Sequence, residues 1–123
     1  MTKTEAAWLA GLFDGEGCVW CRWPKRTNVL VEIKMTHKET LERVNELFPG
    51  RLVSGNLSRG AFGRKPQWRW SLDTNGSRRF LTTVMPYLVT KKIEAAIAIG
   101  LCDSRRDVCL MDMLAEALKD ARA

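Results

Sequence analysis

The sequence lacks any long hydrophobic run, which excludes a membrane-spanning helix. No stretch of its 123 residues approaches the roughly 18 consecutive apolar residues that such a helix needs. The N-terminus also lacks the apolar segment of a secretory signal, so we expect an intracellular protein with no membrane partner. Low-complexity segments are missing too. With 46% hydrophobic and 28% charged residues, the composition is that of one globular domain over residues 1–123.

Cysteine and histidine, the usual zinc ligands, are scarce: the chain has four cysteines and one histidine. Cys18 and Cys21 have a spacing that can begin a zinc site, but Cys102 and Cys109 are too widely spaced to form a matching pair. Residues three apart on a strand also point to opposite faces. In an intracellular protein these thiols are expected to be reduced, so neither zinc nor disulfides are favoured.

Acidic residues are few in the middle of the chain. The net charge is +6 and the pI is about 9.5. Residues 17–92 contain fifteen of the twenty Lys and Arg residues but only five of the fourteen Asp and Glu residues. This cationic middle favours a polyanionic partner, because phosphate contacts release counterions. A solvated basic surface would give the same composition, so charge alone does not decide between them.

Hydrophobic periodicity predicts an α+β fold of the αββαββα type with additional C-terminal helices. Helices are expected over residues 4–15, 77–87, 91–102 and 105–121, and another after a capping box of Thr36 and Glu39. Strands are expected over residues 17–23, 29–36, 51–58 and 66–73. They should form a four-stranded antiparallel sheet with helices on one face and the other face free.

Strand alternation predicts which side chains lie on the free face. In the last strand Trp68, Trp70 and Leu72 suit the core, so the residues between them point outward. In the first strand, Val19, Cys21 and Trp23 suit the core by the same reasoning. For residues 51–58 both alternations mix polar and apolar residues, so no face is assigned. The predicted outward side chains, which can read base edges in a major groove, are Trp20, Arg22, Glu32, Lys34, Gln67, Arg69 and Ser71.

Residues 9–17 read LAGLFDGEG. This segment closely resembles the LAGLIDADG signature, with Phe13 for the first Ile and Gly15-Glu16 for Ala-Asp, and the expected elements downstream fit the homing endonucleases of that family. Small residues at i, i+4 suit a close helix–helix contact. Acids at the negative C-terminal end of a helix make sense if a cation binds there, although an ordinary helix whose acids face water is the alternative. Gly15 and Gly17 are expected to allow a left-handed turn.

The resemblance implies a sequence-specific endonuclease of double-stranded DNA. A single motif implies a homodimer with a near-palindromic target, its helices meeting at the two-fold axis through Ala7, Ala10, Gly11 and Asp14. Glu16 and the backbone carbonyl of Gly15 would hold Mg²⁺, for which Mn²⁺ or Ca²⁺ can substitute, and Asp14 would be mostly structural, capping backbone amides. The implied biological role is homing, the cutting of an allele that lacks the encoding intron.

The resemblance also implies further site residues. Lys91, after Pro86-Tyr87-Leu88, matches a catalytic-pocket lysine, although it could be a solvated residue at a helix start. His37 matches a polar position near the attacking water, but a first-turn histidine with no task is an equal alternative. Residues expected to reach phosphates or flanking bases lie in two loops: Lys25, Arg26, Arg59, Arg64 and Lys65.

Two other functions remain open. One is a non-cleaving relative, such as an intron maturase or a regulator that binds DNA or RNA with the same fold; the presence of Glu16 argues against it. The other is an unrelated basic module for RNA or single strands, with Trp20 as a stacking platform. Two-fold binding to duplex DNA would argue against the second.

Overall fold

The structure is a computed structural model, and it describes residues 1–22, 28–54, 66–104 and 108–122. The helices are α1 (Lys3–Glu16), α2 (Lys38–Leu47), α3 (Thr74–Val84), the 3-10 helix η1 (Met85–Tyr87), α4 (Lys92–Asp103) and α5 (Val108–Arg122). The strands are β1 (Gly17–Cys21), β2 (Val29–Met35), β3 (Arg51–Ser54) and β4 (Trp68–Leu72). The predicted α+β class is confirmed. None of the described helices is long and apolar enough to cross a membrane.

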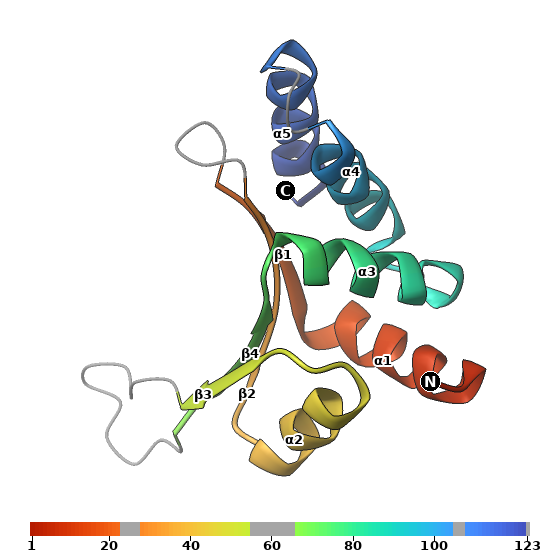
Figure 1. Ribbon diagram of the computed structural model, residues 1–123, viewed down its shortest axis with the longest axis vertical. Coiled ribbons are helices and arrows are strands. Elements are labelled where there is room, and N and C mark those ends of the chain that lie inside the picture. Colours follow the sequence, from red (N-terminus) through yellow and green to blue (C-terminus); the bar gives the residue numbers. More distant parts are fainter. Residues whose placement is uncertain (23–27, 55–65, 105–107, 123) are drawn as a thin grey trace.

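The four strands form one antiparallel sheet in the order β1-β2-β4-β3. The helices lie on one side of this curved sheet, and no described helix covers its other side, which we call the open face (Figure 1). Helix α5 packs on α4 rather than on the middle of the sheet. The predicted arrangement of one covered and one open face is therefore confirmed.

The core lies between the sheet and the helices, and Phe80 of α3 is at its centre. The ring of Phe80 meets Phe13, Phe48 and Trp70 edge-on, with centroids 5.3, 5.4 and 5.4 Å apart. The predicted strand alternation holds here, since Val31 and Trp70 are fully buried. Burial of such large rings stabilises the fold, because it removes much apolar surface from water.

The junction between α1 and β1 differs from expectation. Gly15 lies within the helix and Gly17 is extended, with φ −84° and ψ 164°, so the predicted left-handed turn is wrong. Gly17 is needed for another reason: a Cβ there would lie 2.1 Å from the ring of Phe13. The chain can turn directly from helix into strand because no side chain separates it from this buried ring.

Two helix starts also differ from the prediction. The expected capping box of Thr36 and Glu39 is not formed, because His37 is the N-cap of α2 and its Nδ1 accepts the amide of Thr40 at 3.3 Å. Helix α3 begins at Thr74 rather than 77, because the Asp73 carboxylate accepts the amide of Gly76 at 2.7 Å. Side-chain acceptors at the N-cap satisfy amides that have no intrahelical partner, and so they fix where each helix begins.

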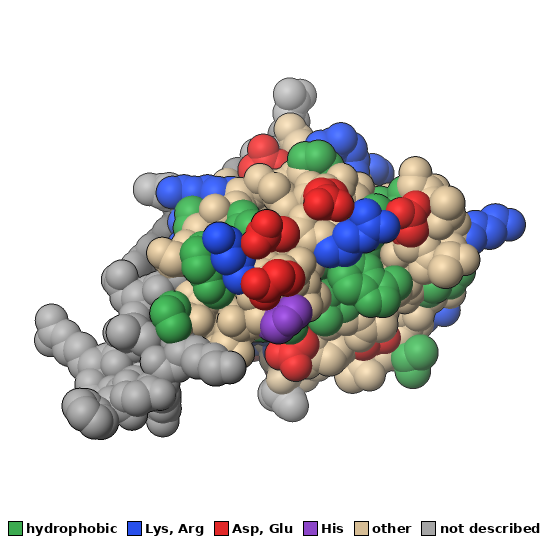
Figure 2. Space-filling view, turned by 90° about the horizontal axis from the view of Figure 1, so that it is seen from below, with side chains coloured by type: hydrophobic (Ala, Val, Ile, Leu, Met, Phe, Trp, Pro, Cys, Tyr) green, Lys and Arg blue, Asp and Glu red, His purple; other side chains and the backbone are tan. Residues whose placement is uncertain are grey.

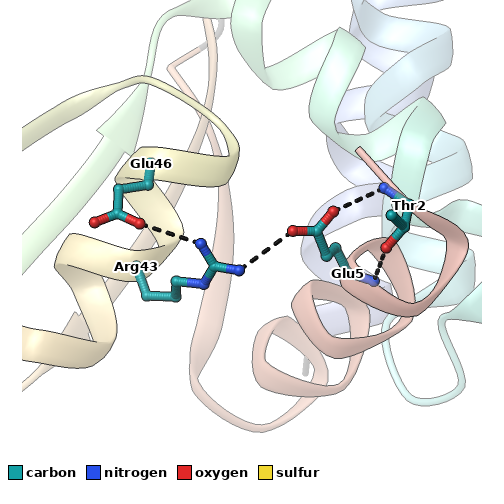
Figure 3. Close-up of polar contacts among 4 residues, drawn as sticks. All are labelled: Thr2, Glu5, Arg43 and Glu46. Atoms are coloured by element: carbon teal, nitrogen blue, oxygen red, sulfur yellow. Dashed lines mark hydrogen bonds and ion pairs between the residues drawn. The ribbon is translucent and has the colours of Figure 1, made fainter.

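A polar chain connects α1 to α2 (Figure 3). Thr2 and Glu5 form a capping box, each accepting the other's backbone amide. The same Glu5 carboxylate accepts from Arg43 of α2 at 3.3 Å, and Arg43 also contacts Glu46 at 3.1 Å. The first turn of α1 is thus held both by its own cap and by the neighbouring helix.

Candidate nucleic-acid interface and active site

The carboxylate of Asp14, near the end of α1, holds the segment that follows η1. Its Oδ2 accepts the backbone amide of Val89 at 2.8 Å, and its Oδ1 accepts that of Lys91 at 2.9 Å. Both oxygens therefore serve residues 75 and 77 positions away in sequence. Two hydrogen bonds to an ionised carboxylate are strong ones, and they fix the start of α4 against α1.

Lys91 is brought directly to the motif. It occupies the N-cap position of α4, where a cation is disfavoured, but its Nζ reaches the backbone carbonyl of Asp14 at 2.7 Å. That carbonyl belongs to the last turn of α1, the negative end of the helix dipole. The Lys91 ammonium also lies 6.0 Å from the ring centre of Phe13. The negative end of α1 thus compensates a charge that is unfavourable at the start of its own helix.

Glu16 is the last residue of α1 and its side chain is exposed. The carbonyl of Gly15 lies in the same last turn, where helix carbonyls have no intrahelical partner. Carboxylate and carbonyl oxygens suit a hard cation such as Mg²⁺ or Ca²⁺. In the part of the chain that the structure describes, no three His, Cys, Asp or Glu residues gather into a metal site.

Beside this end, α1 presents a stripe of small exposed residues, Ala7, Gly11 and Gly15, which we call the small-residue face. A Cβ added at Gly11 or Gly15 would meet nothing within 4 Å. Trp8, which is 41% exposed, flanks the stripe. Ala10, expected at the dimer axis with Ala7 and Gly11, is fully buried in the core of its own chain and so is not available to a partner's helix.

The ring of His37 is engaged at the start of α2. Its Nδ1 lies 2.6 Å from the hydroxyl of Thr40, and its Nε2 lies 3.6 Å from the Glu39 carboxylate. Figure 2 shows acidic side chains gathered around the single histidine on this face. The cap gives His37 a structural task at the start of α2, which neither reading of the sequence included. Its place near an attacking water stays a prediction.

The predicted outward residues do lie on the open face, and some contact one another. The Trp20 indole donates to Glu32 at 2.9 Å, and the Lys34 ammonium lies 3.5 Å from the same carboxylate. Arg122 of α5 stacks on the Trp20 ring, with its Cζ 4.2 Å from the ring centre. Glu32 is therefore occupied by two neighbours and fixes the side chains of Trp20 and Lys34 on the sheet.

Two further cationic residues line the same region, and the sequence did not indicate the first of them, Arg51. Pairing of β3 with β4 sets Arg51 opposite Ser71, so Arg51 joins the open face together with Arg69. Arg79, in the second turn of α3, lines a hollow at the end of the sheet together with Arg51 and Arg69. The sequence left Arg79 either as a contact to the phosphate backbone or as a solvated residue. The sequence could not indicate Arg51, because its direction follows only from the pairing of β3 with β4, and the alternation within β3 is ambiguous.

Gln67 is exposed just before β4, with the parity of Arg69. Five predicted cationic residues lie outside the described residues: Lys25, Arg26, Arg59, Arg64 and Lys65. Trp23, expected at the end of the first strand, is outside them as well.

Comparison with protein families identifies the relatives of the chain. The family model for the LAGLIDADG-like domain matches residues 3–83, from α1 into α3. The chain belongs to this family. The match includes Glu16 and most of the open face, while Lys91 and helices α4 and α5 lie beyond it. Comparison with curated protein sequences gives no match.

Solved structures extend the LAGLIDADG likeness to the whole fold. The homing endonuclease I-CvuI, in complex with its target in the presence of Ca, superposes with a TM-score of 0.73 at 16% identity, over 96% of this chain and 82% of that one. The archaeal intron-encoded homing endonuclease I-Vdi141I, complexed with DNA, gives 0.71 at 14% identity, over 96% and 84%. The meganuclease I-SmaMI gives 0.61 at 11% identity, over 95% of this chain but only 43% of that one. This chain thus spans most of the length of I-CvuI and I-Vdi141I, but less than half of the length of I-SmaMI.

Proposed function

We propose that this protein is a site-specific endonuclease of double-stranded DNA that works as a homodimer with a divalent cation. The observation that carries the proposal is the end of α1, where the exposed Glu16 closes a LAGLIDADG-type motif and Lys91 is fixed to the same turn. The open cationic face of the sheet supports a DNA substrate. The DNA-bound structures of I-CvuI and I-Vdi141I, which share the fold, support it as well.

The homodimer is supported by the small-residue face of α1. Small residues allow two helix backbones to approach closely, and none of the residues that the structure describes covers Gly11 or Gly15. A second copy related by two-fold symmetry would bring a second Glu16 to the first, which would supply the oxygens that one chain lacks. Two identical sheets would then read two similar half-sites, so we expect a near-palindromic target.

The cation that we propose is Mg²⁺, held by Glu16 and the carbonyl of Gly15. When bound there, such an ion neutralises charge on a phosphate and makes a coordinated water more acidic. The chain's own residues contribute position and charge: Asp14 fixes the segment carrying Lys91, and Lys91 places an ammonium at the last turn of α1. Neither of these contacts involves a side chain of the open face. On this proposal, the open face binds the DNA.

The experiment that tests the proposal compares the wild type with Glu16→Gln on a randomised library of duplex DNA with Mg²⁺. Glu116→Gln, an exposed glutamate of α5, is the matched control because it removes the same charge elsewhere. We expect cuts within a long near-palindromic site for the wild type and the control, and a loss of at least about a hundredfold in rate for Glu16→Gln. All three proteins should still bind the selected duplex site when Ca²⁺ replaces Mg²⁺.

Other results would lead to different conclusions. If the wild type selects a duplex site but never cuts it, the protein is a binding relative such as a maturase or regulator. If it selects no duplex, or if Glu16→Gln cuts as fast as the wild type, the proposal is wrong.

A further inference from the structure

Four arginines from four different segments converge on one hollow of about 510 Å³ at the end of the sheet. Arg22 follows β1, Arg51 begins β3, Arg69 lies in β4 and Arg79 lies in α3. The hollow extends from the open face, past the ends of the strands, to the first two turns of α3. Such convergence of like charges is unfavourable unless an anion shares the space.

The charges of these four arginines are not neutralised by any acid in the described part of the chain. No ion pair joins any of the four to an acid among the residues that the structure describes. Two acids also line the hollow, but both have other partners: Glu32 accepts from Trp20, and Asp73 accepts the amide of Gly76. Arg79 has its guanidinium carbon 5.9 Å from the ring centre of Phe48. The hollow therefore keeps an excess of positive charge.

Arg51 reaches the hollow because Gly50 precedes it. A Cβ at Gly50 would lie 2.7 Å from the Ser71 carbonyl and 2.9 Å from the Trp70 indole nitrogen. That nitrogen is buried and has no hydrogen-bond partner within residues 1–22, 28–54, 66–104 and 108–122. Only a glycine lets the chain pass this close to β4, and this close passage places the first residue of β3 beside Arg69 and Arg79.

Arg79 lies on α3, away from the strand residues that we expect to read bases. Side chains that read bases stand on the open face, whereas α3 packs against the covered face and reaches the hollow only where the strands end. Contacts from the margin of a DNA-binding surface fall on the sugar-phosphate backbone, and guanidinium groups match phosphate oxygens in pairs. We propose that this hollow binds backbone phosphates of the DNA, and that Arg51 and Arg79 complete it. The inference rests on the proposed function.

The test measures duplex binding in Ca²⁺ over a range of salt concentrations, on the selected site and on a random duplex. Arg51→Gln and Arg79→Gln are compared with Arg78→Gln. Arg78 is the matched control because it is adjacent in the same helix, but its guanidinium pairs with Asp103 at 2.6 Å. We expect each hollow variant to lower affinity roughly tenfold on both duplexes. The slope of log K against log salt should fall by about one per subunit. Arg78→Gln should change neither by a comparable amount, and Arg79→Lys should restore the slope.

Three results would overturn the inference. If the variants relax the preference for one base pair while the salt slope is unchanged, these arginines read bases. If binding does not change, the DNA does not use the hollow. If the wild type itself fails to bind any duplex, the proposed function fails, and the inference fails with it. Thermal unfolding of each variant shows whether a loss of binding reflects a loss of the fold.

Discussion

Asp14 shows how one side chain can connect distant parts of a small protein. Its two oxygens accept amides from Val89 and Lys91, and its own carbonyl accepts the ammonium of Lys91. The acid at this position of the motif therefore has a structural task, in contrast to the exposed Glu16 two residues later. Of these two carboxylates, only that of Asp14 is directed at backbone amides among the residues that the structure describes.

Replacing Asp14 by Ala should therefore destabilise the protein. Two charge-assisted hydrogen bonds are lost and two amides are left without acceptors, so we expect a loss of roughly 2–4 kcal/mol in the free energy of unfolding. Asp14→Asn, which keeps one acceptor oxygen, should lose about half as much. Urea unfolding measures both changes. The exposed Asp120→Ala of α5 serves as control and should change by less than about 0.5 kcal/mol. Equal losses in the free energy of unfolding for Asp14→Ala and Asp120→Ala would show that the two hydrogen bonds of Asp14 do not stabilise the fold.

At the scale of elements, two glycines in and just after α1 are required for opposite reasons. Gly17, at its end, faces the buried Phe13 ring, whereas Gly11 faces open space on the small-residue face. The first glycine is demanded by the fold of one chain. The fold of one chain does not require Gly11, because alanine at this position would favour the helix more. A glycine here is what we expect where another helix packs closely.

Alanine substitutions should separate these requirements. Gly17→Ala should cost about 1–3 kcal/mol of stability, because the ring of Phe13 has little room to move in a packed core. Gly11→Ala should stabilise the isolated chain by up to about 1 kcal/mol, yet weaken the proposed dimer. Urea unfolding at low concentration and sedimentation equilibrium measure the two properties. A dimer as strong in Gly11→Ala as in the wild type would contradict the proposed helix contact.

The connection between α1 and α2 should make stability depend on pH. Hydrogen bonds from Thr2 and the nearby Arg43 hold the pKa of Glu5 below its ordinary value of 4.5. A depressed pKa contributes stability above the ordinary value, and this contribution is lost as the pH falls through the folded-state pKa. The free energy of unfolding should therefore fall less steeply on acidification below about pH 4.5 in Glu5→Gln than in the wild type. Glu116→Gln should follow the wild type, and identical curves for all three would contradict the assignment.

At the scale of the whole molecule, the features that could be predicted from the sequence are those that depend on a repeated pattern of polar and apolar residues. Alternation in β2 and β4 indicated the covered and open faces, because one face of each strand is uniformly apolar. Single-residue features were not predictable in the same way. His37 rather than Thr36 is the N-cap of α2, since neighbouring polar residues compete as caps and packing decides between them. Arg51 was missed because its direction depends on pairing with β4.

The attachment of Lys91 to α1 has a consequence for how such a protein can change over generations. The bonds that hold this end together are made by Asp14 with backbone amides and by Lys91 with a backbone carbonyl, and none involves a side chain of the open face. Outward residues such as Lys34 and Arg69 can be exchanged without disturbing the core. On the proposed function, a lineage could acquire a new target site one strand position at a time while inheriting its cutting machinery unaltered.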